Sequence, residues 1–224
     1  MSDQVYVQDQ PGLVESLFPT LVYWAFVGRQ TNIQTEIDAL YPKLEFRYAN
    51  NMGDGPVGPR PAGYTAGWGK THKLNVPLSA DDEVFTQDLL TELPMLADAL
   101  DQHINHYLDA LGWEARSYRR TSWMTGLDEG DYIHQHTHRP SDLTGVYFYK
   151  AIPDDGVLTF MVPTPGMAQD PTYENVPQTW EHQPVEGKLI LFPAWLTHGV
   201  GKTLRSDHTR HSISWNIEFN GVGQ

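Results

Sequence analysis

The sequence contains no cysteine in its 224 residues, which excludes disulfide bonds and thiolate metal ligands. A metal ion would therefore have to be held by histidine, aspartate, glutamate or backbone oxygen. The sequence also lacks an apolar run of about 18 residues and a basic, apolar leader pattern at its N-terminus. We therefore expect a soluble, cytoplasmic protein with no membrane association.

Positive charge is scarce as well. The chain has 15 lysine and arginine residues against 28 aspartate and glutamate residues, which gives a net charge of -13. A negative charge of this size repels polyanions at long range. Nucleic acid and anionic membranes are therefore disfavoured as partners, and the acidity favours solubility.

The length is that of one well-buried domain, and we expect residues 1–224 to form a single domain. Within it, residues 1–112 are predicted to supply an N-terminal strand, a loop and helical support. Residues 113–219 are predicted to form the β-rich core.

The N-terminal part shows three patterns. Residues 13–27 include a strand-like run, and residues 31–44 read as a short helix capped by Thr31 or Asn32. Residues 49–75 are rich in glycine and proline, which predicts a long loop.

Residues 79–112 carry the clearest helical pattern. Ser79 precedes an acidic first turn, and apolar residues then recur at helical spacing. Pro94 divides the region into two predicted helices, because proline removes a backbone donor. The second helix is expected to end at Gly112.

The apolar pattern changes to a period of two over residues 113–219. The strand-like runs are EARSYRRTSWMTG, DYIHQHTH, LTGVYFYKA, GVLTFMV, KLILFPA, THGVGK and HSISWNIEF. Many short strands after a helical segment predict a mainly β fold with flanking helices (α+β). The expected architecture is a double-stranded β-helix, that is, a jelly roll or cupin-like barrel, with helices packed on one outer face.

Histidines cluster in this strand-rich part, where seven of the ten lie between residues 134 and 211. The stretch HQHTHRPSDLTGVYFY, residues 134–149, contains the overlapping pairs His134/His136 and His136/His138. Residues i and i+2 of a strand project from the same face, so either pair could offer two imidazoles to one metal ion. Periodicity does not choose between the pairs.

A distant strand offers a third ligand, because His198 follows an apolar run and a proline turn in GKLILFPAWLTHGV. A barrel that places His198 beside an H-x-H pair would form an open three-ligand metal site. The alternative is a turn histidine bound only by water. The spacing from Gly130 through the H-x-H pair to Asp142 matches the first cupin pattern, and the spacing before His198 matches much of the second.

The final strand adds an anion-binding pattern. In RHSISWNIEF, Arg210 and Ser212 form R-x-S on one face of the strand. A planar guanidinium beside a hydroxyl is suited to hold a carboxylate through two hydrogen bonds. An ordinary surface ion pair of Arg210 is the alternative.

These motifs resemble a family of 2-oxoglutarate/Fe(II)-dependent oxygenases found in marine bacteria and T4-like phages. The resemblance rests on HTHRPSDLTGVYFY, LILFPAWLTHGV and RHSISWN, and more weakly on LFPTLVY and GYTAGWGKTHKL near the N-terminus. It implies Fe(II) as cofactor and 2-oxoglutarate as co-substrate. It also implies that O2 oxidises 2-oxoglutarate to succinate and CO2 while a C–H bond of the substrate is hydroxylated.

Carried over by residue, the resemblance makes His136, His138 and His198 the metal ligands. Arg210 and Ser212 would hold the distal carboxylate of 2-oxoglutarate, and His134 would lie outside the ligand set. Most of the wider superfamily has a carboxylate where His138 stands, so this site would carry one more positive charge. Asp142 is the alternative source of a carboxylate.

Other functions fit parts of the pattern. A cupin-type dioxygenase or isomerase would use the same histidines without 2-oxoglutarate, and a non-catalytic jelly roll would only bind or support a partner. The substrate, a peptide or a small molecule, and the oligomeric state are not specified by the sequence. Two turn-rich segments, 58–72 and 163–182, could close over the site as lids.

The aromatic residues near these motifs have two interpretations. They could line a substrate pocket, or they could belong to the ordinary core of the barrel. They are Tyr147, Phe148, Tyr149, Trp195 and Trp215.

Overall fold

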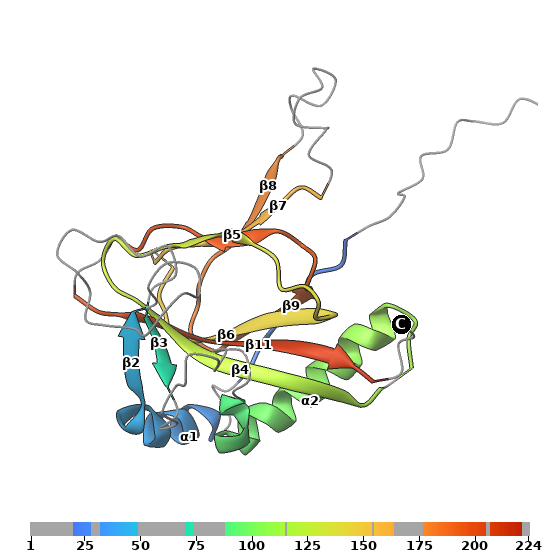
Figure 1. Ribbon diagram of the computed structural model, residues 1–224, viewed down its shortest axis with the longest axis horizontal. Coiled ribbons are helices and arrows are strands. Elements are labelled where there is room, and N and C mark those ends of the chain that lie inside the picture. Colours follow the sequence, from blue (N-terminus) through green and yellow to red (C-terminus); the bar gives the residue numbers. More distant parts are fainter. Residues whose placement is uncertain are drawn as a thin grey trace, which may run out of the picture.

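A computed structural model of the protein describes residues 20–27, 32–48, 70–73, 88–114, 116–153, 155–163, 177–204 and 207–220. Strands are the main regular secondary structure of these residues, and helices are few (Figure 1). The mainly β prediction is therefore confirmed. Within the described ranges, no helix is long and apolar enough to cross a membrane.

The elements have the following bounds. The helices are α1 (Ile33–Leu40) and α2 (Pro94–Ala110), with 3-10 helices η1 (Tyr41–Lys43) and η3 (Leu89–Glu92). The strands of the first half are β1 (Tyr23–Phe26), β2 (Glu45–Tyr48), β3 (Lys70–Lys73) and β4 (Tyr118–Leu127). The later strands are β5 (Ile133–His136), β6 (Leu143–Lys150), β7 (Leu158–Met161), β8 (Thr179–His182), β9 (Lys188–Pro193), β10 (His198–Val200) and β11 (Arg210–Phe219).

The strands form two antiparallel sheets. The larger sheet has seven strands in the order β1-β9-β6-β11-β4-β3-β2, and the smaller has four in the order β5-β10-β7-β8. A cluster of buried residues joins strands β6 and β9 of the large sheet to β7 of the small one, and includes Phe148, Phe160 and Phe192. This inter-sheet core shows that the two sheets pack face to face.

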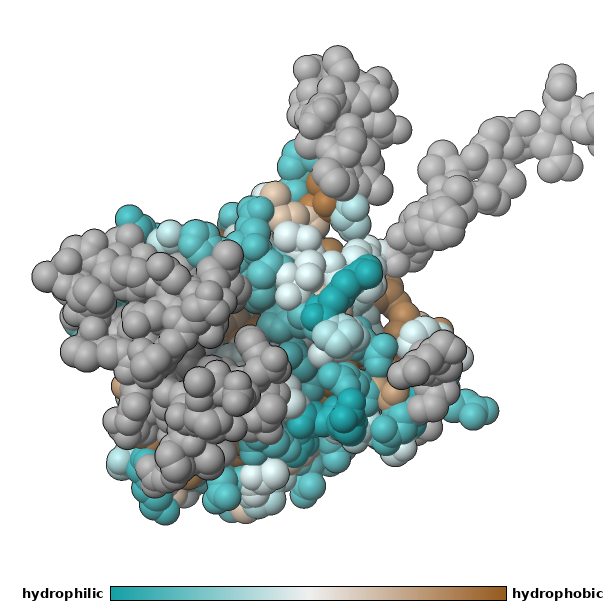
Figure 2. Space-filling model, viewed as in Figure 1, coloured by the Kyte–Doolittle hydropathy of each residue, from teal (hydrophilic) through white to brown (hydrophobic). Residues whose placement is uncertain are grey.

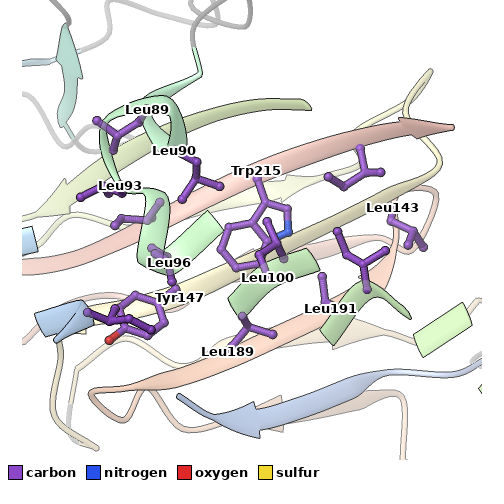
Figure 3. Packing of buried hydrophobic residues seen from close by; sticks show 14 of the residues in the cluster. Leu89, Leu90, Leu93, Leu96, Leu100, Leu143, Tyr147, Leu189, Leu191 and Trp215 are labelled. Carbon is purple, nitrogen blue, oxygen red and sulfur yellow. The ribbon is translucent and has the colours of Figure 1, made fainter. Parts of the chain in front are cut away.

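A second core lies on the other face of the large sheet, where α1 and α2 cover it (Figure 1). Apolar residues of α2 recur at helical spacing, and Leu96, Leu100 and Ile104 are all buried against the sheet. Figure 3 shows Trp215 of β11 among leucines from this helical region and from β9. Helices on one outer face are therefore as predicted.

The strong helical prediction holds in its second half. Helix α2 begins at Pro94, where a missing backbone N–H costs nothing, and Gly112 follows it with a φ of 70°. Before Pro94, the described residues form the 3-10 helix η3 instead of an α-helix. Ser79, the expected cap, lies outside the described residues.

Two strands occur where loops were predicted. β3 falls in the glycine- and proline-rich stretch and pairs with β2 and β4, and β8 falls at the end of segment 163–182 and pairs with β7. The loop predictions for these residues were wrong, because pairing with a neighbouring strand outweighs a weak local preference. Most of segments 58–72 and 163–182 lies outside the described residues.

The surface agrees with the acidic composition. Where described residues are visible in Figure 2, the face is mainly hydrophilic, and apolar residues gather where the β7–β8 hairpin leaves the body. Trp180 of β8 has 67% of its surface exposed. The apolar exposure of this hairpin stands out from the rest of that face.

Candidate active site

Two histidines of the small sheet and one that follows β5 come together at one point. In the β5–β10 pair, His136 lies directly opposite His198. His138 follows two residues after the end of β5 and turns its ring toward both. Its Nε2 lies 3.1 Å from His136 Nε2 and 3.2 Å from His198 Nε2. The structure thus brings together the three histidines named from the sequence.

In two of these rings, the nitrogen that faces away from the other histidines is bonded to a backbone carbonyl. His136 Nδ1 lies 2.7 Å from the carbonyl oxygen of His134, and His198 Nδ1 lies 2.9 Å from that of Leu196. A carbonyl oxygen only accepts, so each Nδ1 carries the proton in these bonds. Each Nε2 is then unprotonated and offers a lone pair that can coordinate a metal ion, which is the arrangement that metal-binding histidines use.

Burial keeps these imidazoles neutral. It lowers the pKa of His138 to about 2 and that of His198 to about 3, with the neighbouring imidazoles as a smaller cause. Burial also lowers the pKa of His136. Because a metal ion binds only the neutral ring, the residues present fit a divalent ion such as Fe(II).

The group holds histidines alone among the described residues, and their candidate ligand atoms lie within 4.8 Å of one another. The Asp142 carboxylate accepts a hydrogen bond from the backbone N–H of Phe219 at 2.8 Å, so it stabilises the end of β11. His134 is exposed and contributes its backbone carbonyl to the site. Three neutral imidazoles would leave the full charge of a divalent ion in place.

Arg210 and Ser212 lie at the start of β11, in the middle of the large sheet, and both are buried. The guanidinium lies over the ring of Phe148, with Cζ 5.1 Å from the centroid. Within the described residues its Nε has no hydrogen-bond partner. Burial lowers the pKa of Arg210 to about 10, and nearby Asp155 opposes this. A buried cation with an unused donor suits an anionic ligand.

The inter-sheet core lies between these two polar groups. The Phe192 ring lies 4.7 Å from both the His198 ring and the Phe160 ring, and Phe148 belongs to the same cluster. The histidines and Arg210 therefore border one apolar interior. Such surroundings exclude water and strengthen electrostatic contacts with a bound ligand.

The aromatic residues singled out from the sequence divide between several places. Tyr147, Tyr149 and Trp215 belong to the core beneath the helices, whereas Phe148 belongs to the inter-sheet core. Trp195 is 41% exposed. The alternation along β6 separates Phe148 from its two tyrosine neighbours.

Two neighbours of the histidines were not anticipated. The Trp123 ring stacks on the His138 ring with centroids 6.0 Å apart. The Asn216 side chain is the second neighbour, and its polar contact opposes the lowering of the His138 pKa by burial. They lie on β4 and β11, whose residues 123 and 214 are paired. Alternation along these strands could have placed both on the inner face, but it could not have shown that His138 reaches them.

A cavity of about 420 Å³ lies beside the site, with Phe160 and Leu196 in its wall. Residues from the described end of segment 163–182 also line it. The lining is Thr20, Val22, Trp24, Phe160, Met161, Val162, Pro163, Pro177, Gln178, Thr179, Trp180, His182 and Leu196. Whether either predicted lid closes over the histidines stays a prediction.

Residues 121–216 match the model of a family described as "Putative 2OG-Fe(II) oxygenase". This span runs from β4 into β11 and contains all five residues proposed from the sequence for the site. No curated protein matches the chain.

Solved structures of 2-oxoglutarate oxygenases and hydroxylases have a similar fold. A prolyl-4-hydroxylase from Pseudomonas putida aligns with a TM-score of 0.54 and 15% identity over 90% of this chain and 94% of that one. A prolyl hydroxylase from Trichoplax adhaerens, in complex with a hypoxia inducible factor oxygen degradation domain peptide fragment, gives 0.58 and 15% over 91% and 87%. HygX from Streptomyces hygroscopicus, with nickel, 2-oxoglutarate and hygromycin B bound, gives 0.55 and 11% over 90% and 84%. At these identities the likeness shows the fold.

Proposed function

We propose that the protein is a 2-oxoglutarate- and Fe(II)-dependent oxygenase, as the family match over residues 121–216 supports, and that it hydroxylates a C–H bond of its substrate. The overall reaction converts R–H, O2 and 2-oxoglutarate into R–OH, succinate and CO2. Bound Fe(II) supplies the redox chemistry of this reaction, and the protein supplies binding, orientation and a dry pocket.

His136, His138 and His198 are the proposed ligands of Fe(II). The observation that carries this assignment is the convergence of their three Nε2 atoms, with His138 Nε2 3.1 and 3.2 Å from the other two. Burial keeps the rings neutral, so protons do not compete with the metal ion near neutral pH.

Arg210 and Ser212 are the proposed partners of the distal carboxylate of 2-oxoglutarate. The guanidinium would donate two hydrogen bonds to that carboxylate, and the Ser212 hydroxyl would donate a third. This role gives the unpartnered Nε of Arg210 an acceptor. It also accounts for a buried cation beside an apolar core, which would otherwise be costly.

The finer features of the fold and the substrate are part of the same proposal. We propose that the two packed sheets form a double-stranded β-helix, the jelly roll expected from the sequence, in a single domain. The substrate is proposed to be a peptide or a small molecule. Two of the similar structures support these two classes, since one contains a peptide fragment and another contains hygromycin B.

Succinate formation tests the proposal. The protein is reconstituted anaerobically with Fe(II), 2-oxoglutarate and O2 are added, and succinate is measured with and without candidate substrates. Wild-type protein is expected to form succinate only with Fe(II), and His136→Ala should lose this turnover. His134→Ala is the matched control, because its exposed ring lies outside the three-histidine group. Equal turnover of wild-type protein and His136→Ala would contradict the proposal.

A further inference from the structure

Two exposed tryptophans lie on the inner faces of the strands that end the two sheets. Among the described strands, β1 ends the large sheet and β8 ends the small one, where it projects from the body with β7 (Figure 1). Directly paired residues share a face, and Trp24 pairs with Ile190 while Trp180 pairs with Phe160. Ile190 and Phe160 belong to the inter-sheet core. Both tryptophans thus face inward, yet Trp24 is 53% and Trp180 67% exposed.

The cavity of about 420 Å³ lies between these two strands, since Trp24 of β1 and Trp180 of β8 both line it. Its volume is within the range of small-molecule pockets, which is about 300–1,000 Å³. Among the described residues, its lining includes none of the three histidines and neither Arg210 nor Ser212. The cavity is therefore separate from the proposed metal and 2-oxoglutarate sites.

A buried cation lies directly behind the wall of this cavity. Lys188 is only 8% exposed, and its Nζ lies 3.2 Å from His182 Nδ1 and 5.3 Å from the centroid of the Trp24 ring. Its other hydrogen bond goes to the carbonyl oxygen of Gln183 at 3.5 Å. Within the part of the chain that the structure describes, Lys188 forms no ion pair with a carboxylate. A buried charge without an opposing charge is costly, so a bound anion would stabilise it.

His182 lies between this cation and the cavity. An ammonium group only donates, so His182 Nδ1 accepts from Lys188 and the neutral ring carries its proton on Nε2. Burial, and secondly the charge of Lys188, lower the pKa of His182, which keeps the ring neutral. His182 is part of the cavity lining. The cavity wall therefore offers an N–H donor with a positive charge behind it, an arrangement that suits an anion.

We propose that this cavity is a further ligand site, which binds a small carboxylic acid with an apolar body. The carboxylate accepts a hydrogen bond from His182 Nε2 and lies near the Lys188 ammonium, and the apolar body lies between Trp24 and Trp180. One cation and one donor match a singly charged carboxylate better than a phosphate ester, which carries up to about two charges near neutral pH. The inference does not depend on the proposed function, because it uses neither the metal ligands nor Arg210.

Paired probes test the inference. They are phenylalkanoic acids of increasing chain length, each compared with its primary amide, which has a similar shape and no charge. 19F NMR of fluorotryptophan-labelled protein reports binding at Trp24 and Trp180, whose signals are assigned with single Trp→Phe variants. Lys188→Met removes the charge and keeps an unbranched side chain. Lys202→Met is the matched control, because Lys202 is exposed and does not line this cavity.

In wild-type protein and Lys202→Met, the acids should shift both tryptophan signals and bind at least about tenfold more tightly than their amides. Lys188→Met should still bind the amides and lose this preference. Absence of acid binding to wild-type protein, or an unchanged preference in folded Lys188→Met, would overturn the inference. An excess of 2-oxoglutarate, which has no apolar body, should not displace the acids. Displacement would also overturn the inference, because the acids would then occupy the co-substrate site.

Discussion

At the scale of single residues, the site is defined by how neutral and charged groups are buried. Three imidazoles are kept neutral, whereas Arg210 stays charged in spite of burial because its pKa falls only to about 10. Neutral rings suit a cation, and a buried cation suits a carboxylate. Burial therefore suits both the three histidines and Arg210 to their proposed ligands. The positive charge lies at Arg210 and not at the histidines.

The pKa of His208 is shifted in the direction opposite to that of the three site histidines. His208 Nε2 lies 3.1 Å from Oδ2 of the buried Asp155 side chain. Although partial burial opposes it, the hydrogen bonds to Asp155 and Asp207 raise the pKa of His208. The folded state therefore binds this proton more tightly than the unfolded chain. The resulting stability is present below the usual pKa of 6.5 and is lost as the pH rises through the raised value.

His208→Gln should therefore destabilise the protein more at pH 6 than at pH 8.5. The expected difference is at most about 1 kcal/mol in the free energy of unfolding, because solvent screens a partly exposed pair. Urea unfolding of both proteins at the two pH values measures it. A difference that grows with pH would contradict the pairing.

The residue-level predictions from sequence worked where alternation applied. The H-x-H motif was correctly read as a source of converging imidazoles, but alternation alone could not choose between the two overlapping pairs. The choice depends on where β5 ends, because His138 reaches the site from beyond the strand. Asn216 and Trp123 were missed because their role depends on that same long-range approach.

At the scale of elements, β11 connects most parts of the molecule. Its odd-numbered residues Ile213, Trp215 and Ile217 enter the core beneath the helices. Its even-numbered residues include Arg210, which lies over Phe148 of the inter-sheet core, and Asn216, which contacts His138. One strand with a period of two thus serves the structural core with one face and the site with the other.

The fit between β6 and its neighbours gives a prediction at this scale. A Cβ atom on Gly145 would lie 2.4 Å from the carbonyl oxygen of Ile190 and 2.8 Å from the indole of Trp215. Neither the strand backbone nor the buried indole can move easily. Gly145→Ala should therefore lower the free energy of unfolding by about 1–3 kcal/mol, as overpacking does.

Chemical unfolding measures this loss, and Gly201→Ala is the control. A Cβ atom on Gly201 would meet its nearest neighbour, the backbone nitrogen of Val157, at an ordinary 3.5 Å. The control should change stability little. Equal stability of Gly145→Ala and wild-type protein would show that β6 and β11 are less tightly packed than described.

The element predictions from sequence succeeded for strongly periodic segments. The second helix and the seven strand-like runs after residue 113 were identified, with shifts at their ends. β3 and β8 were missed because each lies in a stretch that reads as a loop and gains its stability from a neighbouring strand. Local pattern carries little information about such elements.

At the scale of the whole molecule, the large sheet lies between the helical core and the three-histidine group. The helices and their core cover one face, and the small sheet with its three histidines covers the other. The architecture was predictable because the change from helical to strand periodicity lies near residue 113. The order of the strands within the two sheets was not, because pairing between strands distant in sequence leaves no local pattern.

The central claim is that two groups hold 2-oxoglutarate. A metal ion on the three histidines binds one end of it, and the Arg210 guanidinium binds its distal carboxylate. Anaerobic calorimetry of 2-oxoglutarate binding to Fe(II)-loaded protein tests it most directly, because this measurement does not require the substrate. Arg210→Lys keeps the charge but loses the two-pronged geometry, and His198→Ala removes a ligand.

Wild-type protein is predicted to bind one 2-oxoglutarate only when Fe(II) is present. Arg210→Lys should bind it at least about tenfold more weakly, since a hydrogen bond to a charged group contributes about 1.5–3 kcal/mol. His198→Ala should show no Fe(II)-dependent binding. Absence of binding to the wild-type protein, or equal affinity in all three proteins, would contradict the account.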